Sequence, residues 1–312
     1  MDGAGFEPAA SAKLLEKVSS KPPLKQKNRL KDTEITEILN KFGEWLEVDE
    51  LRKSRTIEHH TGWIRNLLND VDVYPPRKED YRSFLKKWKN KSGVYHYSNA
   101  IKAVRVFTRF LGSEEIGKSF KFPRIDRPII VVKKKRELKK FYTEGLTHLG
   151  DKALFLVLAT SGLRHHEVTG LTLKDVNLEK GMIIPNNGKG TVRGTKNTFI
   201  TFINSEAQTV LKNFMSAQEI GENDKIFRKG FGKSGITYRW NKASKKSGVK
   251  LIPSDLRDWF CNEMGRLGVA DRYIDAFCGR VPRSILGRHY TDYSPERLKE
   301  IYEKTKIKLL EF

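Results

Sequence analysis

Residues 251–290 read LIPSDLRDWFCNEMGRLGVADRYIDAFCGRVPRSILGRHY, and this stretch decides how the second half of the chain folds. Its apolar residues recur at the spacing of amphipathic helices. The pattern predicts two helices, over 254–267 and 270–277, each with one face in a core. The arginines and the tyrosine of the same stretch are the residues best suited to chemistry.

These residues are Arg257, Arg280 and Tyr290, and we group them with Arg164 farther upstream. A guanidinium group binds two phosphate oxygens at once and never deprotonates. Attack on a phosphodiester concentrates charge on the non-bridging oxygens, which three arginines would stabilise. The ordinary pKa of a phenol is about 10, and clustered cations would lower it and ease attack by Tyr290. The four residues therefore predict a phenol that attacks DNA.

The composition predicts a soluble globular protein with a polyanionic partner. The chain has 312 residues, enough for two domains of ordinary size. Lys and Arg total 60 against 38 acidic residues, a formal charge of +22, whose self-repulsion opposes compaction. Nucleic acid explains this charge better than a membrane surface does, since no basic amphipathic helix is evident. No apolar run could cross a bilayer and residues 1–12 lack a signal core, so we expect a cytoplasmic, nucleoid-associated protein.

The sequence offers no site for a metal or a cofactor. Cys261 and Cys278 lack zinc-ligand spacing, and we expect two buried reduced thiols. There is no Walker loop and no carboxylate cluster. A covalent phosphotyrosine would conserve the energy of the broken bond, so rejoining would need neither ATP nor metal.

The first part of the chain reads as a tail, a helical domain and a linker. Residues 1–32 are basic and Pro-containing, and we expect a flexible tail. Apolar residues at helix spacing predict a four-helix, DNA-binding domain over 33–112 with Lys- and Arg-rich polar faces. Residues 113–135 lose this periodicity and contain Pro123 and Pro128, so we expect an interdomain linker.

Residues 136–312 read as a second domain that is mainly α-helical with a small antiparallel sheet. Its predicted strands lie at 171–173, 181–185 and 197–203, the last two joined by a loop rich in Gly, Asn and Lys. Its predicted helices lie at 137–145, 151–162, 205–217, 237–246, 254–267, 270–277 and 294–310.

Several motifs of this domain resemble those of the tyrosine recombinases, the lambda-integrase family. Gly162-Leu163-Arg164-His165-His166-Glu167 resembles the family's GLR-x-x-E signature, and Asp255-Leu256-Arg257 its second-arginine motif. Cys278-Gly279-Arg280 aligns with the LGH motif, and His289-Tyr290 with the nucleophile segment. The resemblance implies a core-binding domain followed by a catalytic domain, and a site made of Arg164, Arg257, Arg280 and Tyr290. It also implies a homo-oligomer on double-stranded DNA, a tetramer in synapsis.

Two positions depart from the family pattern. Ser254 stands where the family usually has His or Lys, which puts charge-dependent work at that position in doubt. Arg280 stands where the family usually has His or Trp. The arginine, with Tyr290 ten residues on, is similar to what archaeal fusellovirus-type integrases carry.

The remaining roles are left with alternatives. The leaving 5′-hydroxyl needs a proton, and Lys196 sits just before the second long strand as the family's catalytic lysine does, with Lys189 as the alternative. Glu167 is expected to orient arginine, and His289 is a candidate neighbour of the site. Tyr293 is the alternative nucleophile to Tyr290, unless its side chain serves only in packing.

The leading function is a site-specific integrase that cuts and rejoins DNA through a 3′-phosphotyrosine. The alternatives are a type IB topoisomerase-like nicking-closing enzyme and a non-catalytic DNA-binding relative. The last helix reads either as packing on its own domain or as a contact to a neighbouring protomer. Gly5-Phe6-Glu7-Pro8 can be encoded by codons containing TTCGA, which resembles the T-loop of a tRNA gene. We hypothesise that residues of about 3–10 are encoded by an attachment core.

Overall fold

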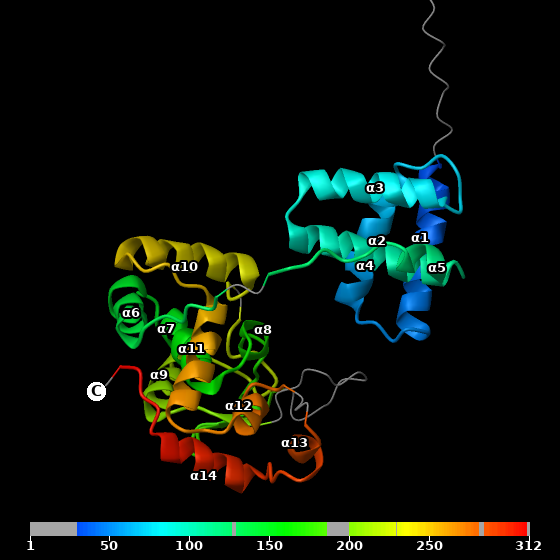
Figure 1. Ribbon diagram of the computed structural model, residues 1–312. Coiled ribbons are helices and arrows are strands. Elements are labelled where there is room, and N and C mark those ends of the chain that lie inside the picture. Colours follow the sequence, from blue (N-terminus) through cyan, green and yellow to red (C-terminus); the bar gives the residue numbers. More distant parts are fainter. Residues whose placement is uncertain (1–29, 127–128, 186–199, 229, 281–283, 311–312) are drawn as a thin grey trace, which may run out of the picture. The chain divides into compact units, whose positions relative to one another are not determined.

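The computed structural model describes residues 30–126, 129–185, 200–228, 230–280 and 284–310. The chain divides into two compact units, Met1–Pro128 and Ile129–Phe312 (Figure 1). The expectation of a mainly helical protein with a small antiparallel sheet is confirmed. The expected tail, 1–32, falls almost wholly outside the described residues.

The first unit is a helical bundle whose helices each bury one apolar face. Aromatic rings dominate its centre, where the ring of Phe42 meets that of Phe107 edge-on at 5.1 Å between centroids. Pro75 and Pro76 lie in the connection before the third helix, where the chain is not helical because proline lacks the backbone N–H that a helix needs. The helices are α1 (Asp32–Val48), α2 (Ser54–Leu68), α3 (Lys78–Lys91), α4 (Val94–Phe110) and α5 (Glu114–Lys118).

Helix α5 lies inside the range that the sequence analysis assigned to a linker. It packs against α4, and a Cβ added at Gly117 would stand 2.2 Å from Thr108 Oγ1, so only glycine permits this approach. The Arg105 guanidinium donates to the Phe120 carbonyl at 2.6 Å and lies 4.4 Å from the Phe122 ring centroid. Residues up to about Phe122 therefore belong to the first unit.

The second unit is built around α7 (Leu149–Ser161), which is mostly apolar and, apart from Lys152, buried from Gly150 to Ser161. A helix without a polar face has to be enclosed by other elements. Both α9 (Ser205–Ser216) and α11 (Pro253–Arg266) pack against it. The other helices are α6 (Lys135–Lys140), which runs into a π-helical turn (Phe141–Gly145), α8 (His165–Val168), α10 (Lys233–Ser247), α12 (Asp271–Phe277), α13 (Ile285–His289) and α14 (Pro295–Thr305).

The sheet is antiparallel in the order β1-β2-β3, with β1 at Val176–Asn177, β2 at Met182–Ile183 and β3 at Thr201–Phe202. Ile183 pairs with Val176 on one side and Thr201 on the other. The strand predicted over 171–173 is wrong: Thr172 forms only an isolated bridge, and the Asp175 carboxylate binds the Thr172 N–H at 2.8 Å in a 3₁₀ turn over Leu173–Asp175. Of the strand predicted over 197–203, residues 197–199 lie outside the described residues, and the described part contains β3.

The last helix ends earlier than predicted and stays with its own unit. It stops at Thr305, because Lys306 adopts a left-handed conformation with φ of 46°. The chain then turns back, and the Glu206 carboxylate accepts the backbone N–H groups of Leu309 and Leu310 at 2.9 and 2.8 Å. In the described residues this segment packs on its own domain, and a contact to a neighbouring protomer stays a prediction.

Candidate active site

Arg257 joins two helix ends. It lies one turn into α11, and its guanidinium donates through Nη1 to the Gly162 carbonyl and through Nη2 to the Cys278 carbonyl at 2.6 Å. Those carbonyls end α7 and α12, where helices leave acceptors unpaired. Burial lowers the pKa of Arg257, and the positive charges of Arg164 and Arg280 lower it further. Gly162 and Cys278 lie two residues before Arg164 and Arg280, so these contacts bring the chain beside both arginines to Arg257.

Gly162 makes this arrangement possible. Its φ of 69° is left-handed, and a Cβ there would stand 2.5 Å from the Phe260 ring and 3.0 Å from Cys278 Sγ. Glycine thus lets α7 end directly against α11 and α12. The turn that follows leads into Arg164.

Arg164 is held by Glu167. As the residue before α8, it has an extended backbone whose N–H donates to Glu167 Oε2 at 2.6 Å. Its Nη1 donates to Glu167 Oε1 at 2.8 Å. The Arg164 side chain is 22% exposed. One carboxylate thus fixes both the backbone and the guanidinium of Arg164.

Arg280 is held less tightly. It follows Gly279, whose φ is 59°, and its N–H donates to the Asp275 carbonyl at 2.8 Å. Its Nη1 stands 3.3 Å from Asp275 Oδ1 and its Nη2 3.6 Å from Cys261 Sγ. The Arg280 side chain is 45% exposed. It can therefore turn toward a phosphate without breaking a buried ion pair.

Tyr290 and Tyr293 occupy different environments. Tyr290 ends α13 and is 77% exposed, and within the described residues its hydroxyl makes no hydrogen bond to an arginine. The Tyr293 hydroxyl donates to the Gly287 carbonyl at 2.8 Å, and its ring lies edge-on to Tyr273 at 6.0 Å. Burial raises the pKa of Tyr293. Tyr293 is thus engaged in packing, whereas Tyr290 is open to a ligand.

The other predicted residues give mixed outcomes. Lys189 and Lys196 lie outside the described residues. Ser254 is exposed at the start of α11, and Asp255 beside it accepts the Ile252 N–H at 3.0 Å. His289 is exposed at the end of α13.

Sequence reasoning missed Cys261, Cys278 and Asp275. The two cysteines were expected to be buried reduced thiols; both are free, Cys278 is buried and Cys261 partly buried, and their sulfur atoms lie 3.3 Å apart beside Arg257 and Arg280. A signal was present: Cys261 lies four residues after Arg257 on one helix, and residues with that spacing share a face.

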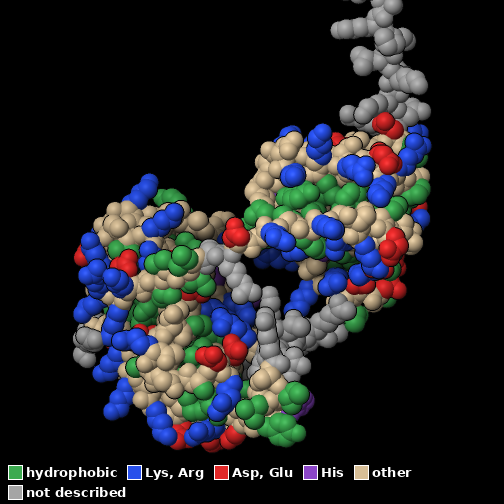
Figure 2. Space-filling model, viewed as in Figure 1, with side chains coloured by type: hydrophobic (Ala, Val, Ile, Leu, Met, Phe, Trp, Pro, Cys, Tyr) green, Lys and Arg blue, Asp and Glu red, His purple; other side chains and the backbone are tan. Residues whose placement is uncertain are grey.

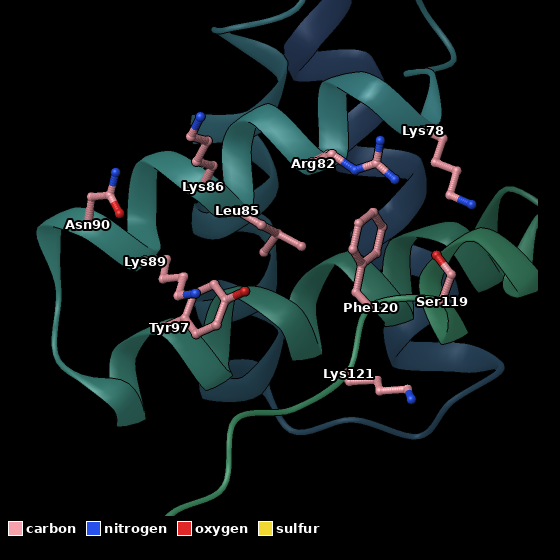
Figure 3. A pocket seen from close by; sticks show the side chains of 10 residues that line it. All are labelled: Lys78, Arg82, Leu85, Lys86, Lys89, Asn90, Tyr97, Ser119, Phe120 and Lys121. Carbon is pink, nitrogen blue, oxygen red and sulfur yellow. The ribbon is translucent and has the colours of Figure 1, made fainter.

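A basic pocket of about 660 Å³ opens on the first unit, between α3, α4 and the segment after α5 (Figure 3). Lys78, Lys86 and Lys89 reach its rim, and none of the described residues that line it is acidic. Such a surface suits phosphate groups. Three other cations of this unit are engaged internally: Lys87 with Asp70, Arg109 with Glu50, and Arg105 with the Phe120 carbonyl. Lys and Arg side chains are spread over the visible face of each unit (Figure 2).

Within the described residues, no helix is both long enough and apolar enough to cross a membrane. No group of three or more His, Cys, Asp or Glu side chains there is placed to hold a metal ion.

Comparison with known proteins identifies the family. The profile of the phage integrase family matches residues 133–297, more than half of the chain. The chain is 28% identical to tyrosine recombinase XerA of Pyrococcus horikoshii over 280 residues, covering 87% of this chain and 94% of that protein.

Solved structures share the fold. The Tn1549 transposon integrase in complex with a circular intermediate DNA aligns with a TM-score of 0.60 and 14% identity, over 84% of this chain and 98% of the other. The lambda integrase tetramer bound to a Holliday junction aligns with a TM-score of 0.60 and 11% identity, over 90% and 86%. The motifs, the fold and the profile agree: the chain belongs to the phage integrase family, the lambda-integrase family of tyrosine recombinases.

Proposed function

We propose that this protein is a site-specific DNA recombinase that cuts and rejoins strands through a phosphotyrosine at Tyr290. The observation that carries the proposal is the Arg257 bridge, which joins the ends of α7 and α12, two residues before Arg164 and Arg280. Placing positive charges near one another costs free energy unless an anion binds among them. The scissile phosphate is that anion.

The reaction is a transesterification. The Tyr290 phenol oxygen attacks phosphorus and forms a P–O bond, while the bond to the 5′ oxygen breaks and its electron pair leaves with that oxygen. Arg164, Arg257 and Arg280 stabilise the charge on the non-bridging oxygens. Lys196, or alternatively Lys189, gives a proton to the leaving oxygen. The phenol proton passes to solvent, and the reverse attack by a 5′-hydroxyl rejoins the strand.

The partner in this proposal is double-stranded DNA, bound by a homo-oligomer that is a tetramer in synapsis, in the nucleoid. The formal charge of +22 and the basic pocket on the first unit support a phosphate-rich ligand. The named relatives include a lambda integrase tetramer on a Holliday junction, which supports the tetramer.

The test uses a half-site DNA that traps the covalent product. DNA of the attachment region is nicked so that the short leaving strand diffuses away after cleavage. Wild-type protein and the Tyr293→Phe variant should form a covalent adduct, and Tyr290→Phe should form none while binding DNA as wild type does. An adduct with Tyr290→Phe and none with Tyr293→Phe would overturn the assignment. Relaxation of a plasmid without attachment sites would instead indicate a topoisomerase-like enzyme.

We also propose that the attachment core lies inside the gene, at the codons for Gly5-Phe6-Glu7-Pro8, and that its chromosomal match is a tRNA gene. The support is the TTCGA that these codons can contain. Synonymous recoding of codons 3–10 should impair integration of the element, while the recoded protein should cleave a synthetic site normally. Unimpaired integration of the recoded element would place the core elsewhere.

A further inference from the structure

Two free thiols face each other at the base of the arginine cluster. Cys261 lies in α11 and Cys278 directly follows α12, and their Sγ atoms are 3.3 Å apart. Cys278 is completely buried, whereas Cys261 is partly exposed. Cys261 is therefore the thiol nearer the surface, and the Cys278 sulfur lies at contact distance from it.

Both cysteines touch the arginines. Arg280 Nη2 lies 3.6 Å from Cys261 Sγ, and the Cys278 carbonyl accepts from Arg257 Nη2 at 2.6 Å. Gly279, in a left-handed conformation, separates Cys278 from Arg280. Any displacement of Cys278 toward α11 therefore moves an acceptor of Arg257 and the backbone that carries Arg280.

The two thiols have unlike acidities. The hydrogen bond from Cys278 lowers the pKa of Cys261, and the charges of Arg280 and Arg257 lower it further. The same hydrogen bond and burial raise the pKa of Cys278. Of the two thiols, Cys261 is therefore the one whose surroundings favour the thiolate, and thiolates beside cations are the thiols that react with oxidants.

We propose that Cys261 and Cys278 are a reversible oxidation site, a dithiol that a hydroperoxide converts to a disulfide and so slows DNA cleavage. The Cys261 thiolate attacks the peroxide oxygen, breaks the O–O bond and becomes a sulfenic acid as the peroxide is reduced to hydroxide. Cys278 then attacks the Cys261 sulfur, forms the S–S bond and expels water after proton transfer. The two sulfurs supply the two electrons, and a thiol reductant reverses the reaction.

The effect on cleavage rests on the proposed function and follows from the geometry. A disulfide removes the negative sulfur beside Arg280, leaving Asp275 as the counter-charge described for it. Bond formation also requires the sulfurs to approach by roughly 1.3 Å, since an S–S bond measures about 2.05 Å. Because active-site donors act only when aimed at the developing charge, a shift of this kind slows the chemical step.

The experiment uses the full-length protein, treated with hydrogen peroxide or left reduced, and then quenched. Peptide mass spectrometry should find the peptides of Cys261 and Cys278 linked, with the loss of two hydrogens. The single-turnover rate on the half-site DNA should fall about tenfold or more and recover with dithiothreitol. Recovery distinguishes the disulfide from methionine sulfoxide, which dithiothreitol does not repair. In Cys261→Ala, and in Cys261→Ser as a second variant, the ratio of treated to untreated rates should be about one.

Each outcome decides something different. Absence of the linked peptide at a peroxide dose that consumes Cys261 would overturn the dithiol. A linked peptide with an unchanged cleavage rate would overturn its control of cleavage. If the reduced protein does not cleave DNA but the oxidised protein contains the linked peptide, the proposed function is contradicted and the oxidation site is still supported.

Discussion

At the residue scale, the site depends on how each guanidinium is held. Arg257 is fixed between two helix ends and Arg164 by both oxygens of one carboxylate, whereas Arg280 has a longer contact to Asp275 and stands more exposed. Fixed donors need no reorganisation when charge develops, which is where their catalytic value lies. Because Arg280 makes the longest contact of the three, its substitution tests the role of the guanidinium with the least disturbance of the surrounding fold.

Arg280→Ala should slow cleavage by about 10²–10³, because it removes one donor aimed at the transition state. Arg280→Lys should recover only part of this loss, since an ammonium group lacks the two-pronged geometry. The measurement is the single-turnover rate on half-site DNA. Arg266→Ala is the matched control. Arg266 is an exposed residue at the end of α11 that pairs with Glu263, so this variant should cleave at the wild-type rate. A wild-type rate for Arg280→Ala would remove this residue from the site.

At the element scale, the sequence predicted the long helices, which a repeated apolar pattern specifies. It did not predict a short helix or a helix end that single contacts determine. Long amphipathic or apolar helices such as α7 and α11 were found because many residues agree on one face. Helix α13 was missed because it is only five residues long and begins where Ser284 accepts the Gly287 N–H at 3.0 Å. The end of α14 was missed because the left-handed Lys306 and the distant Glu206 set it.

The same contrast holds for the candidate site. Sequence motifs named Arg164, Arg257 and Arg280, and Arg257 donates to the carbonyls of Gly162 and Cys278, which lie two residues before the other two arginines. The sequence did not give the acceptors of Arg257, because the Gly162 and Cys278 carbonyls meet it only when α7 and α12 end at one point. It did not give the thiol pair for the same reason, as Cys261 and Cys278 lie on different helices.

Glu206 should be the residue that holds the C-terminal segment in place. It is nearly buried and accepts two backbone N–H groups of that segment, and hydrogen bonds to a charged group contribute about 1.5–3 kcal/mol each. Glu206→Gln keeps the shape but loses the charge and one acceptor, so the free energy of unfolding should fall by about 1.5–3 kcal/mol. Urea denaturation measures it. Glu303→Gln, at an exposed carboxylate paired with Lys299, should change little, and equal stability of the two variants would contradict the assignment.

At the scale of the whole molecule, the excess of positive charge sets how the protein meets DNA. Binding that neutralises phosphates releases counterions, so the logarithm of the affinity falls linearly with the logarithm of salt concentration. Arginines of the first unit that pair internally, such as Arg109 with Glu50, contribute less to this than cations without such a partner. The pocket lined by Lys78, Lys86 and Lys89 gathers cations, and among the residues that the structure describes no acidic one lines it. It is the part of the first unit that we expect to contact phosphate.

Lys89→Gln should weaken DNA binding equally on specific and unrelated duplexes, because a phosphate contact reads no base. It should also reduce the salt slope by about 0.9, the contribution of one neutralised phosphate. Fluorescence anisotropy over a series of salt concentrations gives both quantities. Lys41→Gln is the control, since it removes the same charge from an exposed lysine that already pairs with Glu37 at 2.7 Å. If the two variants lose the same slope, only net charge matters and the pocket has no special role. If Lys89→Gln alone changes it, the pocket holds a phosphate.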